Sequence, residues 1–370
     1  MARRRSNQEG SFYQRPDGLW IGRVSVDGKR RQFTGKTRTE AAKKLAQFVR
    51  EPYELSATSV GEYLQFWLNE ICAPKLKPRT LDSYQGIVRL YIEPKLGKVK
   101  LSKLGASQIL GWRNQLLKSH LSPRTVHHAY SVLRTALGRA VKLGLVPRNV
   151  VLLVDPPTVK DVEIEVMTPS QVQALLAAAQ GARFDNLFAV LASTGLRLGE
   201  AQALRWCDVD LDQGLLRVQH TLYWPARQPW SLAEPKSVRS RRVVPLIGQA
   251  RQALVAQRDR QVFERQAAGS KYVDADLVFA TPFGSPVRSW GVEYDFKKAL
   301  KAAGLPLSHH PHSLRHGAAT FLLASGAAEA TVMRFLGHTN IATTRGYSHV
   351  LDTMLASAAL DLETFMASAV

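Results

Sequence analysis

A run of paired prolines and mixed charges near the middle of the chain limits how the polypeptide can fold. The run contains Asp155-Pro156-Pro157, followed by Lys160, Asp161, Glu163 and Glu165. Since prolines interrupt both helices and central strands, we expect a linker over residues 151–167. The 370 residues also exceed what one hydrophobic core usually organises. We therefore expect two or three domains, with a boundary at this linker.

Residues 1–55 are predicted to form three strands and one helix. Pro16-Asp17-Gly18 is a turn signal before a β-prone run. Thr39 is expected to cap the helix that follows, whose apolar residues share one face. The cations in this part that we expect to contact nucleic acid are Arg15, Arg23, Lys29, Arg30 and Arg31. Basic residues on strands are often only a solvated face, so composition leaves that alternative open.

Residues 56–150 are predicted to form four or five helices. Ser59 and Glu62 have the spacing of a capping box, and Pro123 stands where a long helix would begin. Gly144 is placed to end that helix. The polar side of the long helix carries Arg124, Arg134 and Arg139. These arginines could contact phosphates, although scattered cations are equally ordinary on a soluble bundle.

The net charge favours a polyanionic partner. Lys and Arg number 50 against 30 Asp and Glu, which gives a formal charge of +20, and duplex DNA would gain most from it. A membrane surface is the alternative, but we find neither a signal peptide nor an apolar run of membrane-spanning length. Only two cysteines, Cys72 and Cys207, occur, which favours a reducing cytoplasm over a disulfide framework.

The second half of the chain, over residues 168–350, is predicted to be mainly helical. Thr168-Pro169-Ser170-Gln171 combines an N-cap, a first-position proline and a capping-box glutamine. Two β-prone runs interrupt the helices at 215–222 and 241–246. Five separated signals in this half carry polar chemistry. In chain order they are Arg197 with Glu200, Lys236, His312 with Arg315, His338, and Tyr347.

Each of these signals has an ordinary structural explanation when it is taken alone. Arg197 and Glu200, three residues apart on one helix face, could be a surface ion pair. Lys236 belongs to a cationic run with Arg239, Arg241 and Arg242. Such runs are usually solvent-exposed charges on the tip of a hairpin. His338 follows a glycine that would end a helix, and Tyr347 could be a packing residue with a solvated hydroxyl.

His312 and His316 are four residues apart, as are the histidines of helical zinc sites. The glutamate of the HExxH motif is missing, and no cysteine or carboxylate stands close by. We therefore expect no metal and no cofactor. His312 and Arg315 instead share a helix face, where they offer one proton carrier and one permanent cation to the same phosphate.

Together the five signals fit cleavage of a phosphodiester with conservation of its bond energy. Such a reaction needs a nucleophile that stays attached, donors to the non-bridging oxygens and an acid for the departing hydroxyl. Tyr347 meets the first need, Arg197 and Arg315 the second, and Lys236 the third. Neither ATP nor water is required.

This order of residues resembles the catalytic pattern of the tyrosine recombinases, the phage integrase family, over roughly residues 168–350. The resemblance implies that Arg197 and Arg315 bind the scissile phosphate and that Lys236 protonates the 5′-hydroxyl leaving group. It makes His312 the proton acceptor from Tyr347. His338 would donate to a phosphate oxygen, and Glu200 falls where the family keeps an acid. The implied enzyme integrates and excises a phage or mobile element through a 3′-phosphotyrosyl intermediate.

The resemblance also implies an architecture, mainly α with small β-sheets. A lambda-like integrase would have an arm-type DNA-binding domain at 1–55, a SAM-like core-binding domain at 56–150 and a mixed α/β catalytic domain at 168–350. An apolar helical stripe at 351–370 would cover its own domain or dock on a neighbour in a homotetramer. The family further implies a host DNA-bending protein and a directionality factor as partners.

Other functions remain open at this point. A type IB topoisomerase uses much the same chemistry, and a chromosome-dimer resolving recombinase shares the site but has two domains. A non-catalytic DNA-binding protein would explain the charge, but not why these polar residues occur together. A metal-dependent nuclease is the weakest alternative, which activity in excess EDTA would exclude.

Overall fold

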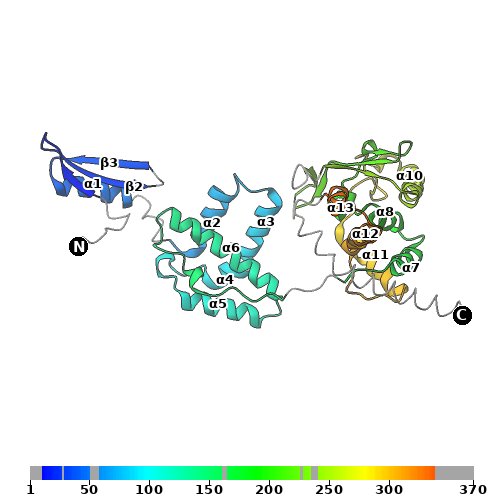
Figure 1. The fold of residues 1–370 in the computed structure, drawn as a ribbon, viewed down its shortest axis with the longest axis horizontal. Coiled ribbons are helices and arrows are strands. Elements are labelled where there is room, and N and C mark those ends of the chain that lie inside the picture. Colours follow the sequence, from blue (N-terminus) through cyan, green and yellow to red (C-terminus); the bar gives the residue numbers. More distant parts are fainter. Residues whose placement is uncertain are drawn as a thin grey trace. The chain divides into compact units, whose positions relative to one another are not determined.

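The computed structural model describes residues 11–26, 29–50, 58–160, 165–225, 228–234 and 241–337. Contacts within the chain divide it into two units, residues 1–161 and residues 162–370. Figure 1 draws the first unit in blue to cyan and the second in green to orange. Among the helices of the described part, none is long and apolar enough to cross a membrane.

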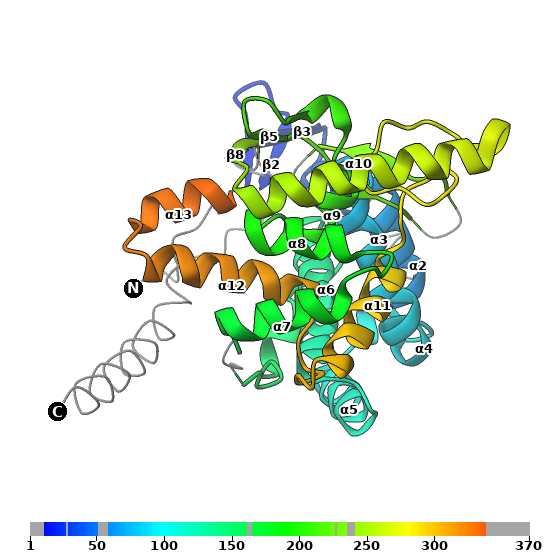
Figure 2. The same ribbon diagram turned by 90° about the vertical axis from the view of Figure 1, so that its right-hand side faces the viewer.

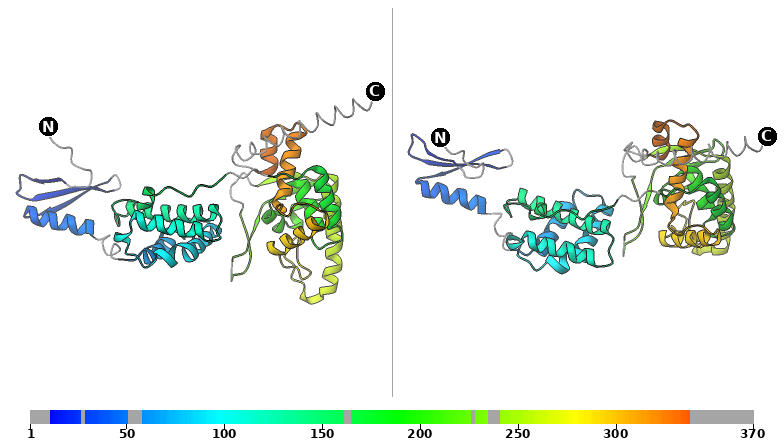
Figure 3. Two further views of the ribbon diagram at one scale, coloured as in Figure 1. Left: turned by 90° about the horizontal axis from the view of Figure 1, so that it is seen from below. Right: turned by 60° about the horizontal axis from the view of Figure 1, so that its bottom comes forward.

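The first unit opens with a three-stranded antiparallel sheet, as expected. Its strands β1 (Ser11–Gln14), β2 (Trp20–Val26) and β3 (Lys29–Gly35) are neighbours in chain order. Helix α1 (Arg38–Arg50) packs against β2 and β3, on one face of the sheet (Figure 3). Thr37 rather than Thr39 caps this helix, because the Thr37 hydroxyl accepts a hydrogen bond from the amide of Glu40 at 3.1 Å. Thr39 therefore lies in the first turn of α1, and the prediction that Thr39 caps this helix was wrong.

A helical bundle follows in the first unit. Its main elements are α2 (Val60–Phe66), which continues as the π-helical segment η2 (Trp67–Cys72), α3 (Pro78–Ile87), η3 (Val88–Ile92), α4 (Glu93–Leu96), α5 (Ala106–Lys118) and α6 (Pro123–Lys142). Single 3-10 turns occur at Leu101–Lys103 and Val150–Leu153. The predicted capping box is confirmed, since the Glu62 carboxylate accepts from the Ser59 amide at 2.7 Å and Ser59 caps in return.

Helix α6 supplies more buried residues to the bundle core than any other helix of the bundle. It begins at Pro123, and Gly144 follows its end with a φ of +73°, as predicted. The buried Tyr130 of α6 donates its hydroxyl hydrogen to the carbonyl oxygens of Val151 and Val154, which are 2.9 and 2.7 Å away. Both valines are buried in this core, so the bundle extends into the segment that we expected to be linker.

The second unit is mainly helical (Figure 2). Its helices are α7 (Pro169–Ala179), α8 (Asp185–Thr194), α9 (Leu198–Gln202), α10 (Gly248–Ala268), α11 (Ser289–Ala302), α12 (Pro311–Ala324) and α13 (Glu329–Leu336). One sheet has the order β4 (Val209–Asp210), β5 (Leu215–Val218), β8 (Arg242–Pro245), and β6 (Thr221–Tyr223) pairs with β7 (Ser231–Ala233). The two predicted β runs are confirmed as β5 with β6 and as β8. Strands β4 and β7 are too short to leave a sequence pattern.

Helix α8 lies at the centre of this unit. It packs against α7, α10 and α12, and four of its apolar residues are buried: Leu187, Phe188, Val190 and Leu191. Phe188 meets Phe296 of α11 edge to face, with 5.2 Å between the ring centroids. This burial fixes the end of α8, from which the chain runs directly into Arg197.

Candidate active site

A close approach of two helix ends sets the position of Arg197. Gly195 ends α8 with a φ of +60°, which favours glycine. A Cβ there would lie 2.5 Å from Cδ2 of Leu336, at the end of α13. Arg197 follows in an extended conformation at the N-cap of α9. The expectation that Arg197 and Glu200 share a helix face was therefore wrong, because Arg197 precedes the helix.

Glu200 reaches back from the third position of α9 and holds Arg197 twice. Its Oε1 accepts from Nη1 of Arg197 at 2.7 Å, and its Oε2 accepts from the Arg197 amide at 3.0 Å. The residue is 4% exposed, so this is no surface pair. Burial alone would raise the pKa of Glu200, but the hydrogen bond and charge of Arg242, together with Arg197, lower it below its usual value. Glu200 is thus an ionised, buried anchor for Arg197.

Arg242 also belongs to this network, although its sequence context had suggested a solvent-exposed surface charge. Its Nη2 donates to Oε2 of Glu200 at 2.9 Å, and its side chain is 4% exposed. Burial alternates along β8, where Arg242 and Val244 are buried while Val243 and Pro245 are exposed, an alternation that the sequence Arg-Val-Val-Pro does not show. Arg242 therefore shares the inward face with a core valine.

His312 and Arg315 both lie on α12, as predicted. Arg315 is 1% exposed. Its Nη1 donates to the carbonyl oxygen of Gly195 at 2.5 Å, and its Nη2 donates to that of Leu336 at 2.8 Å. One guanidinium therefore links the ends of α8 and α13.

Three arginines donate to three successive carbonyl oxygens at the end of α13. Arg242 Nε lies 2.7 Å from the oxygen of Phe335, Arg315 Nη2 2.8 Å from that of Leu336, and Arg197 Nη2 3.4 Å from that of Gly337. The last carbonyls of a helix lack partners within it and carry the negative end of its dipole. The end of α13 is therefore a fixed point at which residues far apart in the sequence converge.

The electrostatic surroundings keep His312 neutral. Burial by surrounding atoms, the neighbouring rings of His316 and His310, and the positive charges of Arg315 and Arg197 lower its pKa to about 3. The His312 side chain is exposed, and the permanent charges of Arg315 and Arg197 disfavour a further positive charge beside them. The rings of His312 and His316 meet edge to face with centroids 4.6 Å apart. A neutral His312 can accept a proton at pH 7.

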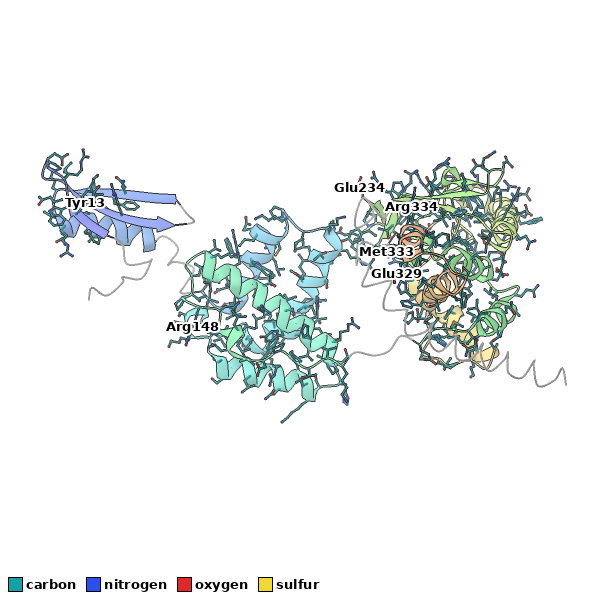
Figure 4. The ribbon with its side chains drawn as sticks, viewed as in Figure 1. Tyr13, Arg148, Glu234, Glu329, Met333 and Arg334 are labelled. Carbon is teal, nitrogen blue, oxygen red and sulfur yellow. The ribbon has the colours of Figure 1, made fainter. Side chains whose placement is uncertain are left out.

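Three predicted catalytic residues lie outside the residues that the structure describes: Lys236, His338 and Tyr347. The predicted helix at 351–370 lies outside them as well. Glu234, labelled in Figure 4, is the last described residue before Lys236 and pairs with Arg241 at 2.6 Å. The structure thus brings together Arg197, Glu200 and the two predicted residues of α12. In the described ranges, no group of three His, Cys, Asp or Glu side chains could hold a metal ion.

The predicted DNA-binding cations of the first unit have varied surroundings. Arg23 lies over the ring of Tyr13, labelled in Figure 4, with 4.6 Å to its centroid, and Arg15 pairs with Asp17 at 3.5 Å. Lys29, Arg30 and Arg31 lie on β3, but their side chains are not described. On α6, Arg124 and Arg134 are exposed, whereas Arg139 is partly buried.

Comparison with known proteins adds independent evidence. The model of the Phage integrase family matches residues 165–354, and that of the Phage integrase, N-terminal SAM-like domain matches residues 59–117. A protein of Caldanaerobacter subterraneus subsp. tengcongensis described as "Tyrosine recombinase XerC-like" is 30% identical to this chain over 346 residues. The match covers 87% of this chain and 88% of that protein.

Two solved structures share the fold. The Tn1549 transposon integrase, in complex with a circular intermediate DNA, has a TM-score of 0.65 and 22% identity over 77% of this chain and 94% of its own. A lambda integrase dimer bound to a COC′ core site has a TM-score of 0.58 and 18% identity over 93% and 96%. Fold and family matches together define the class, which is that of enzymes that break and rejoin DNA. More particularly, this chain belongs to the phage integrase family of tyrosine recombinases.

Proposed function

We propose that this enzyme cuts and rejoins duplex DNA at attachment sites through a covalent bond between Tyr347 and a 3′-phosphate. The observation that carries the proposal is the meeting of Arg197 and Arg315 at the end of α13, directly before the segment that contains His338 and Tyr347. Two permanent cations at one point suit a phosphate that gains charge in its transition state.

The surroundings of Arg197 and Arg315 support different roles for the two arginines. The Arg197 side chain is 39% exposed and is hydrogen-bonded to the buried Glu200. Its guanidinium can therefore donate to a non-bridging phosphate oxygen. Arg315 is buried against two carbonyl oxygens, and it adds positive charge from within the protein. Such preorganised charges stabilise the crowded phosphorus without a reorganisation cost.

The bond changes balance without a cofactor. The Tyr347 oxygen attacks phosphorus and gives its proton to neutral His312, while the bond from phosphorus to the 5′-oxygen breaks. Lys236 protonates the departing 5′-oxygen, and His338 donates a hydrogen bond to a phosphate oxygen. A 5′-hydroxyl of another strand then attacks the phosphotyrosine in the reverse sense, which rejoins DNA and restores Tyr347.

We assign the parts of the chain in the same order as expected from the sequence. Residues 1–55 would bind arm-type sites, and residues 56–150, together with the bundle residues up to Val154, would bind the core site. Residues 168–350 would catalyse, and the linker would begin after Val154. The matches to residues 59–117 and 165–354 support the second and third assignments. The helix at 351–370 would dock on a neighbouring subunit of a homotetramer, which would act on attachment-site DNA in a bacterial cytoplasm with a bending protein and a directionality factor.

A cleavage assay on a nicked duplex that carries the junction of the element with its host DNA tests the proposal. The nick lets the cut strand diffuse away, so a protein-DNA adduct that withstands denaturant should accumulate, in excess EDTA as well. Tyr347→Phe should give no adduct. Tyr294→Phe is the matched control, since Tyr294 is an exposed tyrosine of α11 in the same unit. An adduct that persists in Tyr347→Phe, or that needs a divalent metal, would exclude the mechanism.

A further inference from the structure

One of the three arginines at the end of α13 has no place in the reaction proposed above. Arg242 lies on β8, opposite Val218 of β5, and Val244 two residues later is fully buried. This strand contacts α13, as Figure 2 also shows. Since its side chain is 4% exposed, Arg242 is not available to DNA on a protein surface.

Arg242 connects two parts of the site through a single planar group. Its Nη2 donates to Glu200, which in turn holds both the side chain and the amide of Arg197. Its Nε donates to the carbonyl oxygen of Phe335, which immediately precedes the carbonyls bound by the other two arginines. Because the guanidinium is rigid and planar, Glu200 and the last turn of α13 cannot move independently while both bonds are intact.

We propose that Arg242 is a positioning residue for DNA cleavage. It holds Glu200, and through Glu200 the guanidinium of Arg197, in a fixed relation to the end of α13, from which the chain leads to His338 and Tyr347. The inference rests on the proposed function, because it assigns Arg242 to the same reaction. A catalytic group displaced by about 1 Å loses about 100-fold in rate, so a residue that fixes this distance controls the rate without touching DNA.

A purely structural role would make a different demand on this position. Neutralising the buried carboxylate of Glu200 requires one positive charge, and lysine supplies that charge. Positioning requires two donors at a fixed angle, which lysine does not provide. Arg242→Lys therefore separates the two roles. Arg242→Gln removes both the charge and the planar pair of guanidinium donors.

The test uses the full-length chain in single-turnover cleavage of the same nicked junction duplex, with the protein saturating. The matched control is Arg241→Gln, which removes an exposed arginine from the neighbouring position. We expect Arg242→Lys to melt near the wild-type temperature and to bind the duplex with unchanged Kd, yet to cleave about 10- to 100-fold more slowly. Arg242→Gln should cleave no faster than Arg242→Lys, and Arg241→Gln should match the wild-type rate at saturation.

A second measurement keeps the test decisive if Arg242→Gln does not fold. In a double-mutant cycle of Arg242→Lys with Glu200→Gln, the two rate losses should be less than additive, because both act on Arg197. Full additivity, or an Arg242→Lys variant that cleaves at the wild-type rate, would overturn the positioning role while leaving the proposed function intact. A wild-type chain that forms no adduct would instead overturn the proposed function, and this inference with it.

Discussion

At the scale of single residues, the site depends on one buried carboxylate. Glu200 accepts hydrogen bonds from the Arg197 amide and side chain and from Arg242, and it is almost completely removed from water. Removing one partner of a buried ion pair leaves the other charge uncompensated, which is costlier than the pair itself. The carboxylate therefore stabilises the fold as well as orienting Arg197.

Glu200→Gln should lower the free energy of unfolding at pH 7 by about 3 kcal/mol, because it removes the buried carboxylate that pairs with Arg242 and Arg197. The loss should depend on pH. Since the pKa of Glu200 is lowered in the folded protein from 4.5, its ionised form contributes stability above that value, and the contribution disappears as the pH falls through the folded pKa. Urea unfolding of both proteins at pH 7 and at lower pH measures this. A difference that stays constant as the pH falls would contradict the ionised state of Glu200.

The residues that the sequence predicted well are those whose roles are local. Ser59, Thr168 and Pro123 begin helices through contacts within a few residues, which sequence spacing expresses directly. Arg242 was missed because its partners, Glu200 and Phe335, lie 42 and 93 residues away. No local pattern reports a contact of that length.

At the scale of elements, the site is assembled where the ends of α8 and α13 meet. Gly195 allows the approach, and Arg315 ties both ends to α12 through their carbonyl oxygens. The motif around Arg197 was recognisable from sequence, but its extended conformation ahead of α9 was not. The end of α13 that Arg197 contacts lies 140 residues further along the chain, so no local pattern reports the contact.

Gly195→Ala should destabilise the second unit by about 1–3 kcal/mol, because its Cβ would overlap Leu336 in a well-packed contact. Gly181→Ala is the matched control, since Gly181 also has a positive φ, of +78°, but its Cβ would meet nothing within 4 Å. The difference between the two variants in urea unfolding isolates the contact between the helix ends. Equal losses in both would show that the approach of α13 is not required for stability.

At the scale of the whole molecule, the chain combines a sheet and a helical bundle in its first unit with a separate second unit. The division between the two units falls within the segment that contains the paired prolines, and prolines interrupt helix interiors and central strands. For residues 1–55 we propose binding to arm-type sites, as the resemblance to lambda-like integrases implies.

Removal of residues 1–55 should weaken binding to distal arm-type sites and spare cleavage of an isolated core site. The reason is that every proposed catalytic residue lies in the second unit. Gel-shift titration on arm-site duplexes and adduct formation on core-site duplexes provide the two measurements. Lost cleavage on the isolated core site, in a truncated protein that still melts cooperatively, would argue against the assigned domains.

Covalent attachment of DNA to Tyr347 is tested most directly by mapping the modified residue. The adduct from the nicked duplex is digested with protease and nuclease, and the modified peptide is sequenced by mass spectrometry. We predict a peptide in which Tyr347 carries a 3′-linked nucleotide phosphate. A nucleotide on any other residue, or a linkage through a 5′-phosphate, would contradict the attack of Tyr347 on a 3′-phosphate.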